Sequence, residues 1–88
     1  MITVNTIDST NFEVIVEGNP TTTHNVTVTH LYYQKLTNSQ VSPEVLVETS
    51  FKFLLERESN TSILARFDLP IIERYFPEYE ETIKTMLE

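Results

Sequence analysis

Residues 42–58, SPEVLVETSFKFLLERE, predict the helix on which the rest of the fold is built. Ser42 suits the N-cap, because its hydroxyl can accept a hydrogen bond from a first-turn amide that has no other partner. Pro43 fits the first helical position, where a missing N–H costs nothing. We therefore expect a central helix over residues 43–58, with apolar or small side chains recurring on its buried face at Leu46, Val47, Ser50, Phe51, Phe53, Leu54 and Leu55.

The chain before this helix alternates as β-strands do. In FEVIVEG the side chains of Phe12, Val14 and Val16 share one face, and THNVTVTH, which starts at residue 23, alternates in the same way. The segment between them holds the only glycine of the chain and a proline, which indicates a turn. ITVNTID, near the N-terminus, offers a third strand. Residues 1–30 thus predict a two- to three-stranded antiparallel sheet, as a hairpin or meander.

Short helices are expected after the central one. The sequence NTS at 60–62 can break that helix and cap a second one over SILARF, residues 62–67. Asp68 then caps a third helix, and Pro77 ends it, because the residue before a proline is pushed out of the α region. A last helix begins at PEYEE, and its apolar face consists of Tyr79, Ile83, Met86 and Leu87.

The expected class is α+β: a single domain over residues 1–88, with strands in 1–30 and a helical part over 42–88. A hairpin alone is marginal in water, so three to four short helices must cover the apolar face of the sheet. The intervening residues 31–41 fit either a short helix or an irregular crossover.

The charge of the chain is negative and uneven. Residues 1–40 carry three acids and one base, a net of −2, and residues 41–88 carry ten acids and five bases, a net of −5; the two sum to −7. A negative field repels phosphate backbones, so direct nucleic-acid binding is not expected.

Compartment and cofactor expectations follow from what the sequence lacks. It has no cysteine, no signal-peptide pattern at MITVNTIDS and no long apolar run, which predicts a cytoplasmic protein without membrane association. With one glycine, no phosphate-cradling glycine-rich loop can be written. No cofactor is expected.

The two histidines are the residues most suited to acid–base or metal chemistry. His24 and His30 share strand parity but lie about 20 Å apart on a straight strand, too far to hold one ion. The favoured interpretation is a strand-end or hydrogen-bonded, partly buried residue in each case. The alternative is a small enzyme or metal-binding protein that uses one of them with a glutamate.

The helical half interleaves aromatic residues with acids. Tyrosines have an apolar body and a polar tip, which suits protein interfaces, although positions in or at the edge of the core are favoured for most of them. Adjacent tyrosines at 32 and 33 cannot both face inward from one helix or strand. The candidate interaction residues are Tyr32, Tyr33, Glu73, Tyr75, Glu78, Tyr79 and Glu80.

These observations favour a non-enzymatic, acidic protein-interaction module, regulatory or self-associating, whose partner is another protein or a second copy. One alternative is an acidic inhibitor that mimics nucleic acid. The stretch NTSILARFDLPIIERYFPEYEE also has the outline of a helix–turn–helix. Its second helix offers isoleucines, acids and aromatics in place of the polar side chains that read base edges, which argues against DNA binding.

The strings SFKFLLERESNTSIL and FDLPIIERYFPEYE together resemble a small family of uncharacterised prokaryotic proteins. The resemblance covers about half of the chain, roughly residues 42–83. It implies a bacterial, cytosolic, single-domain protein, and it implies no activity, cofactor or catalytic residue.

Overall fold

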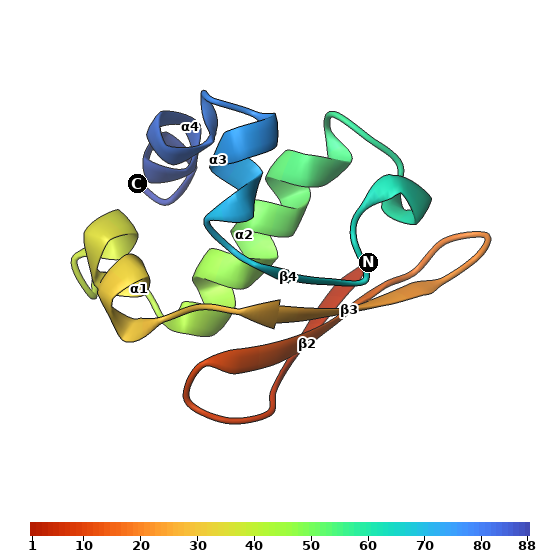
Figure 1. Ribbon diagram of the computed structural model, residues 1–88, viewed down its shortest axis with the longest axis horizontal. Helices are drawn as coiled ribbons and strands as arrows, with labels where there is room; N and C mark the ends of the chain where they lie inside the picture. The colour runs from red at the N-terminus through yellow and green to blue at the C-terminus, as the bar shows by residue number, and fades with distance from the viewer.

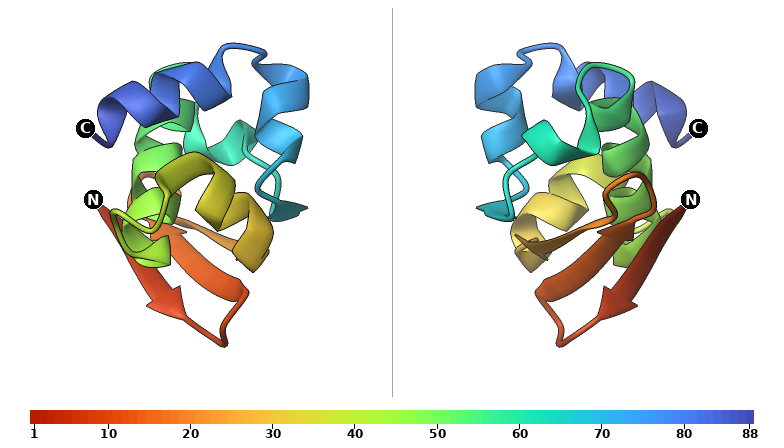
Figure 2. Two further views of the ribbon diagram at one scale, coloured as in Figure 1. Left: turned by 90° about the vertical axis from the view of Figure 1, so that its left-hand side faces the viewer. Right: turned by 90° about the vertical axis from the view of Figure 1, so that its right-hand side faces the viewer.

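The computed structural model describes residues 1–88 as a four-stranded sheet beneath a layer of helices (Figures 1 and 2). This arrangement confirms the α+β class. The strands lie in the order β1-β2-β3-β4, and their bounds are β1 Ile2–Thr6, β2 Asn11–Val16, β3 Thr22–Thr27 and β4 Arg66–Asp68. The α-helices are α1 His30–Thr37, α2 Pro43–Leu55, α3 Ile71–Tyr75 and α4 Tyr79–Met86, and η1 Asn60–Ser62 is a 3₁₀ turn.

The first three strands form the predicted antiparallel meander. Val14 lies opposite Val4 on β1 and His24 on β3, so the inward-facing residues of the three strands align in register. Side chains alternate between the two faces of a strand. On β2 every second side chain is buried beneath the helices, as are His24 and Val26 on β3, whereas Ile2 and Val4 of β1 are half-buried. The opposite face carries polar residues such as Glu13, Asn25 and Thr27.

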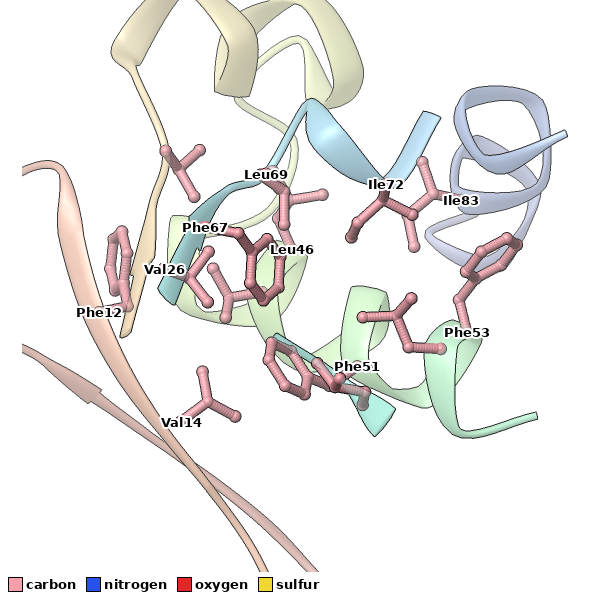
Figure 3. Close-up of a cluster of buried hydrophobic side chains, with 14 of the residues drawn as sticks. Phe12, Val14, Val26, Leu46, Phe51, Phe53, Phe67, Leu69, Ile72 and Ile83 are labelled. Carbon is pink, nitrogen blue, oxygen red and sulfur yellow. The ribbon is translucent and has the colours of Figure 1, made fainter. Parts of the chain in front are cut away.

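Helix α2 is the central helix that the sequence predicts. The Ser42 hydroxyl accepts a hydrogen bond from the Val45 amide at 3.2 Å, and Pro43 is the first helical residue. The helix ends at Leu55, three residues earlier than expected. In Figure 3, Phe51 lies toward Val14 of the sheet, whereas Phe53 lies on the side of α4. Helix α2 therefore packs against both the sheet and α4. Its buried residues are Leu46, Val47, Ser50, Phe51, Phe53 and Leu54.

Residues 31–41, for which the sequence leaves two possibilities, form helix α1 over most of their length. The Thr29 hydroxyl caps it by accepting a hydrogen bond from the Tyr32 amide at 3.2 Å. Asn38 ends it in the left-handed conformation, with φ of 51°. Asparagine adopts that conformation at a lower cost than most residues, so it suits the end of a helix.

The prediction of a helix over residues 62–67 is wrong. The chain makes only the η1 turn there and then enters β4, which pairs in parallel with β3, Val26 opposite Phe67. The free edge of β3 supplies backbone partners, and Phe67 becomes a buried strand residue between two exposed neighbours. The helix–turn–helix outline is therefore not formed.

The start of α3 also differs from the expectation, and its end does not. Asp68 belongs to β4, and Pro70 occupies the N-cap position of α3 without a side-chain cap. Phe76, the residue before Pro77, has φ of −134° and leaves the helical region as predicted. Helix α4 follows directly. None of the helices combines the length and apolar character that crossing a bilayer requires.

Candidate functional site

Three of the seven predicted interaction residues join α1 to the C-terminal helices. The Tyr32 hydroxyl donates a hydrogen bond to Glu80 Oε2 at 2.8 Å, and Lys35 Nζ lies 3.2 Å from Glu80 Oε1. The Glu80 amide donates to Glu73 Oε2 at 2.9 Å. Tyr32, Glu73 and Glu80 thus form one polar link that docks α1 onto α3 and α4.

This link has defined protonation states at neutral pH. Burial, together with the hydrogen bond to Glu80, raises the pKa of Tyr32, so its hydroxyl stays a donor. Partial burial acts to raise the pKa of Glu80, but the hydrogen bonds from Tyr32 and Lys35 and the lysine charge outweigh it. The net pKa of Glu80 is lowered, which keeps the carboxylate an acceptor.

Tyr79 is a core residue, which corrects its prediction as a surface contact. Its side chain is fully buried, with its ring 5.2 Å from that of Phe53. Its hydroxyl donates to Ser50 Oγ at 2.6 Å, and Ser50 in turn donates to the Leu46 carbonyl at 2.8 Å. Burial raises the pKa of Tyr79. Tyr79 is buried because α4 packs against α2 on the side that carries this tyrosine.

Tyr33 and Glu78 also have partners within the chain. The Tyr33 hydroxyl donates to the Val41 carbonyl at 2.5 Å. Glu78 is exposed and accepts from Arg57 Nε at 3.1 Å, and the Arg57 guanidinium lies 3.6 Å from the centre of the Phe53 ring. The Glu78 backbone amide, followed by Arg57, lowers the pKa of the Glu78 carboxyl. Both residues hold elements together.

Of the two placements that the sequence favours for His24, the structure has the hydrogen-bonded one within the core. It is buried, with Nδ1 2.8 Å from the Leu64 carbonyl and Nε2 2.8 Å from the Thr22 hydroxyl. A carbonyl can only accept, so Nδ1 donates to Leu64, and in the neutral imidazole Nε2 is then the acceptor for the Thr22 hydroxyl. His30 is exposed at the start of α1. Neither imidazole forms an ion pair with a carboxylate, and no three acidic or histidine side chains cluster as metal ligands.

Tyr75 is the predicted tyrosine that the fold leaves open to solvent, at 65% exposure. Close to it in space is Leu64, at 47% exposure. The two flank a groove of about 220 Å³ between β4 and α3. Polar lining comes from Glu58 and Ser62, and the apolar lining consists of Leu54, Ile63, Leu64, Phe67, Ile71, Ile72, Tyr75 and Phe76.

Leu64 lies at this groove because residues 62–67, which were expected to be helical, form the end of η1 and the start of β4. Ile63 and Phe67 are buried, whereas Leu64, Ala65 and Arg66 between them are exposed. The imidazole of His24 holds the Leu64 carbonyl, and the Asn60 amide donates to the Pro20 carbonyl at 2.9 Å. The helix expected over residues 62–67 gave no sign that Leu64 would face this groove, because the course of this segment depends on its pairing with β3.

A second hollow continues the groove along β4. It shares Leu64, Phe67 and Ile71 with the first and adds a charged rim of Arg66, Asp68 and Arg74. None of these three rim residues forms an ion pair within the chain. The arrangement offers apolar contact next to unpaired charge of both signs, which suits recognition of another polypeptide.

Comparisons with protein-family models, curated proteins and solved structures find no match to this chain.

Proposed function

We propose that this protein is a non-enzymatic interaction module that binds another polypeptide through the groove between β4 and α3. The observation that carries the proposal is the joint exposure of Leu64 and Tyr75 on a groove whose lining is mostly apolar. Burying apolar surface is favourable by roughly 25 cal/mol for each Å² removed from water, so a complex in which the partner covers both side chains is stabilised. Tyrosine adds a polar tip that can hydrogen-bond at the rim of an interface.

The groove reduces the predicted set of acidic and aromatic contact residues to those at one place on the surface. Tyr75 remains a contact residue, and Leu64 joins it. Glu78 and Glu80 have cations beside them within the chain, Arg57 and Lys35. These internal pairs give less support to the acidic mimic of nucleic acid, because they leave fewer free carboxylates to imitate a phosphate backbone.

The alternative that uses a histidine with a glutamate draws no support from His24, because both of its ring nitrogens are engaged with uncharged groups. His30 lies on α1, with its ring 6.1 Å from that of Tyr33. The proposal of an interaction module rests on the groove alone.

Site-specific photo-cross-linking in the native cell tests the proposal. A photoreactive amino acid placed at Tyr75 or at Leu64 is expected to give covalent adducts with another polypeptide chain. The matched control is Leu31, which is 81% exposed on α1 and lies outside the groove. The proposal is contradicted if adducts are absent at both groove positions, or if they form equally at Leu31.

A further inference from the structure

Strand β4 is an open edge of the sheet. It is last in the strand order, and in Figure 2 no element lies beyond it. Its pairing with β3 uses alternate residues: the Ala65 carbonyl accepts from the Asn25 amide at 2.8 Å, and the Leu69 amide donates to the Thr27 carbonyl at 2.9 Å. By this alternation, the backbone groups of Arg66 and Asp68 point away from the sheet.

The side chains at this edge carry opposite charges. Arg66 and Asp68 are two residues apart on the exposed face of the strand, and neither is paired within the chain. Of the three rim charges of the second hollow, these two belong to β4 itself. Two copies of the strand Arg66–Asp68 are therefore complementary in charge when they pair in antiparallel orientation.

We propose that a second copy of this chain adds to the β4 edge as an antiparallel strand, about a two-fold axis at Phe67. In that register Arg66 lies opposite Asp68 of the second copy, and Asp68 lies opposite its Arg66. These are the positions with outward backbone groups, so each pair exchanges both of its hydrogen bonds. Opposite charges directly across such a pair stabilise it.

The neighbouring symmetric registers are unfavourable. An axis at Arg66 puts the two arginines opposite each other, and an axis at Asp68 puts the two aspartates opposite each other. Like charges directly across a strand pair destabilise it. If the register shifted by one residue, the outward backbone groups of Arg66 and Asp68 would face residues of the second copy whose backbone groups are already bonded to its own β3. Charge and alternation thus select one register.

The other edge of the sheet has no such pattern. Strand β1 reads ITVNT, without a charged residue, and α2 packs against it. In the proposed pairing Leu64 comes opposite Pro70 of the second copy, at the start of α3. The proposed dimer then covers part of the groove, so this inference rests on the proposed function and names the polypeptide that the groove binds.

Sedimentation equilibrium over a wide concentration range tests the register. The wild-type chain is expected to show a monomer–dimer equilibrium. Arg66→Asp and Asp68→Arg each convert both attractive pairs to repulsive ones, which should weaken dimerisation by roughly tenfold or more. An equimolar mixture should recover the association, because one chain then presents two acids and the other two bases.

Two controls separate charge pairing from other effects. Lys84→Asp changes the net charge as Arg66→Asp does, but on α4, and should leave the dimerisation constant unchanged. Urea unfolding of each variant verifies that the monomer fold is retained, as expected for exposed side chains with no partner in the chain.

A wild-type chain that stays monomeric, or a dimer that ignores both charge reversals and their mixture, overturns this inference. The proposed function fails separately. If the chain is monomeric but photo-cross-linking at Tyr75 captures a different protein, only the self-pairing is lost. If groove adducts are absent as well, both proposals are lost.

Discussion

At the scale of single residues, the core contains a short chain of hydroxyls that fixes two helices together. Tyr79 of α4 donates to Ser50 of α2, and Ser50 donates to the Leu46 carbonyl one turn earlier. All three residues are buried, and no buried side-chain polar atom of the protein lacks a partner. A serine on the apolar face of α2 is explained by this contact.

Replacing Ser50 by alanine is expected to destabilise the protein by about 1–3 kcal/mol, because it leaves the Tyr79 hydroxyl buried without an acceptor. Urea unfolding monitored by circular dichroism measures the change. Adding Tyr79→Phe to Ser50→Ala removes both partners, so the double variant should lose less than the sum of the two single variants. Additive losses would show that the two hydroxyls are not coupled.

At the scale of elements, α2 and β4 form for different reasons. Helix α2 has its own cap, a proline at its first position and a repeating apolar face, all readable within its 13 residues. Strand β4 has three residues and depends on β3, some forty positions earlier in the chain. A strand of that length has little stability without its neighbour.

The N-cap of α2 provides a test at this scale. Ser42→Ala removes the acceptor of the Val45 amide and is expected to cost about 1 kcal/mol of unfolding free energy. Hydrogen exchange should speed up at that amide. Ser9→Ala, at an exposed serine in the turn between β1 and β2 with no side-chain hydrogen bond, should change neither quantity. Equal effects at the two positions would contradict the role of the cap.

At the scale of the whole molecule, four carboxyl groups accept hydrogen bonds that lower their pKa, and three of the four join separate elements. Glu44 is hydrogen-bonded by the Thr6 hydroxyl, which joins α2 to β1. Asp8 accepts from the backbone and side chains of Thr10 and Asn11. Glu78 and Glu80 hold α4 to α2 and α1. The acidic side chains thus stabilise the fold as anions.

Stability should therefore fall in acid. Each of these groups has a folded pKa below its unfolded value, so its contribution is complete above the ordinary carboxyl pKa of about 4 and is lost as the pH falls through the lowered value. The urea midpoint is expected to be constant near neutrality and to decline below about pH 4. Glu80→Gln should make that decline shallower. A midpoint that holds or rises in strong acid would contradict this linkage.

The sequence by itself determined the class of fold, an antiparallel hairpin or meander within residues 1–30, the central helix with its cap and the break at Pro77. Each of these depends on signals within a few residues: period, cap or turn chemistry. Tyr75 was identified as a candidate contact on the same grounds, as an aromatic residue beside acids.

Tertiary structure alone decided the rest. It made a strand of residues 66–68 by offering them the free edge of β3, and it buried Tyr79 by turning α4 onto α2. It also brought Leu64 beside Tyr75, which are eleven positions apart in the chain, to form the groove. The physical reason is that pairing and burial between distant segments depend on what each segment finds opposite it, and a three-residue strand is too short for periodicity to reveal.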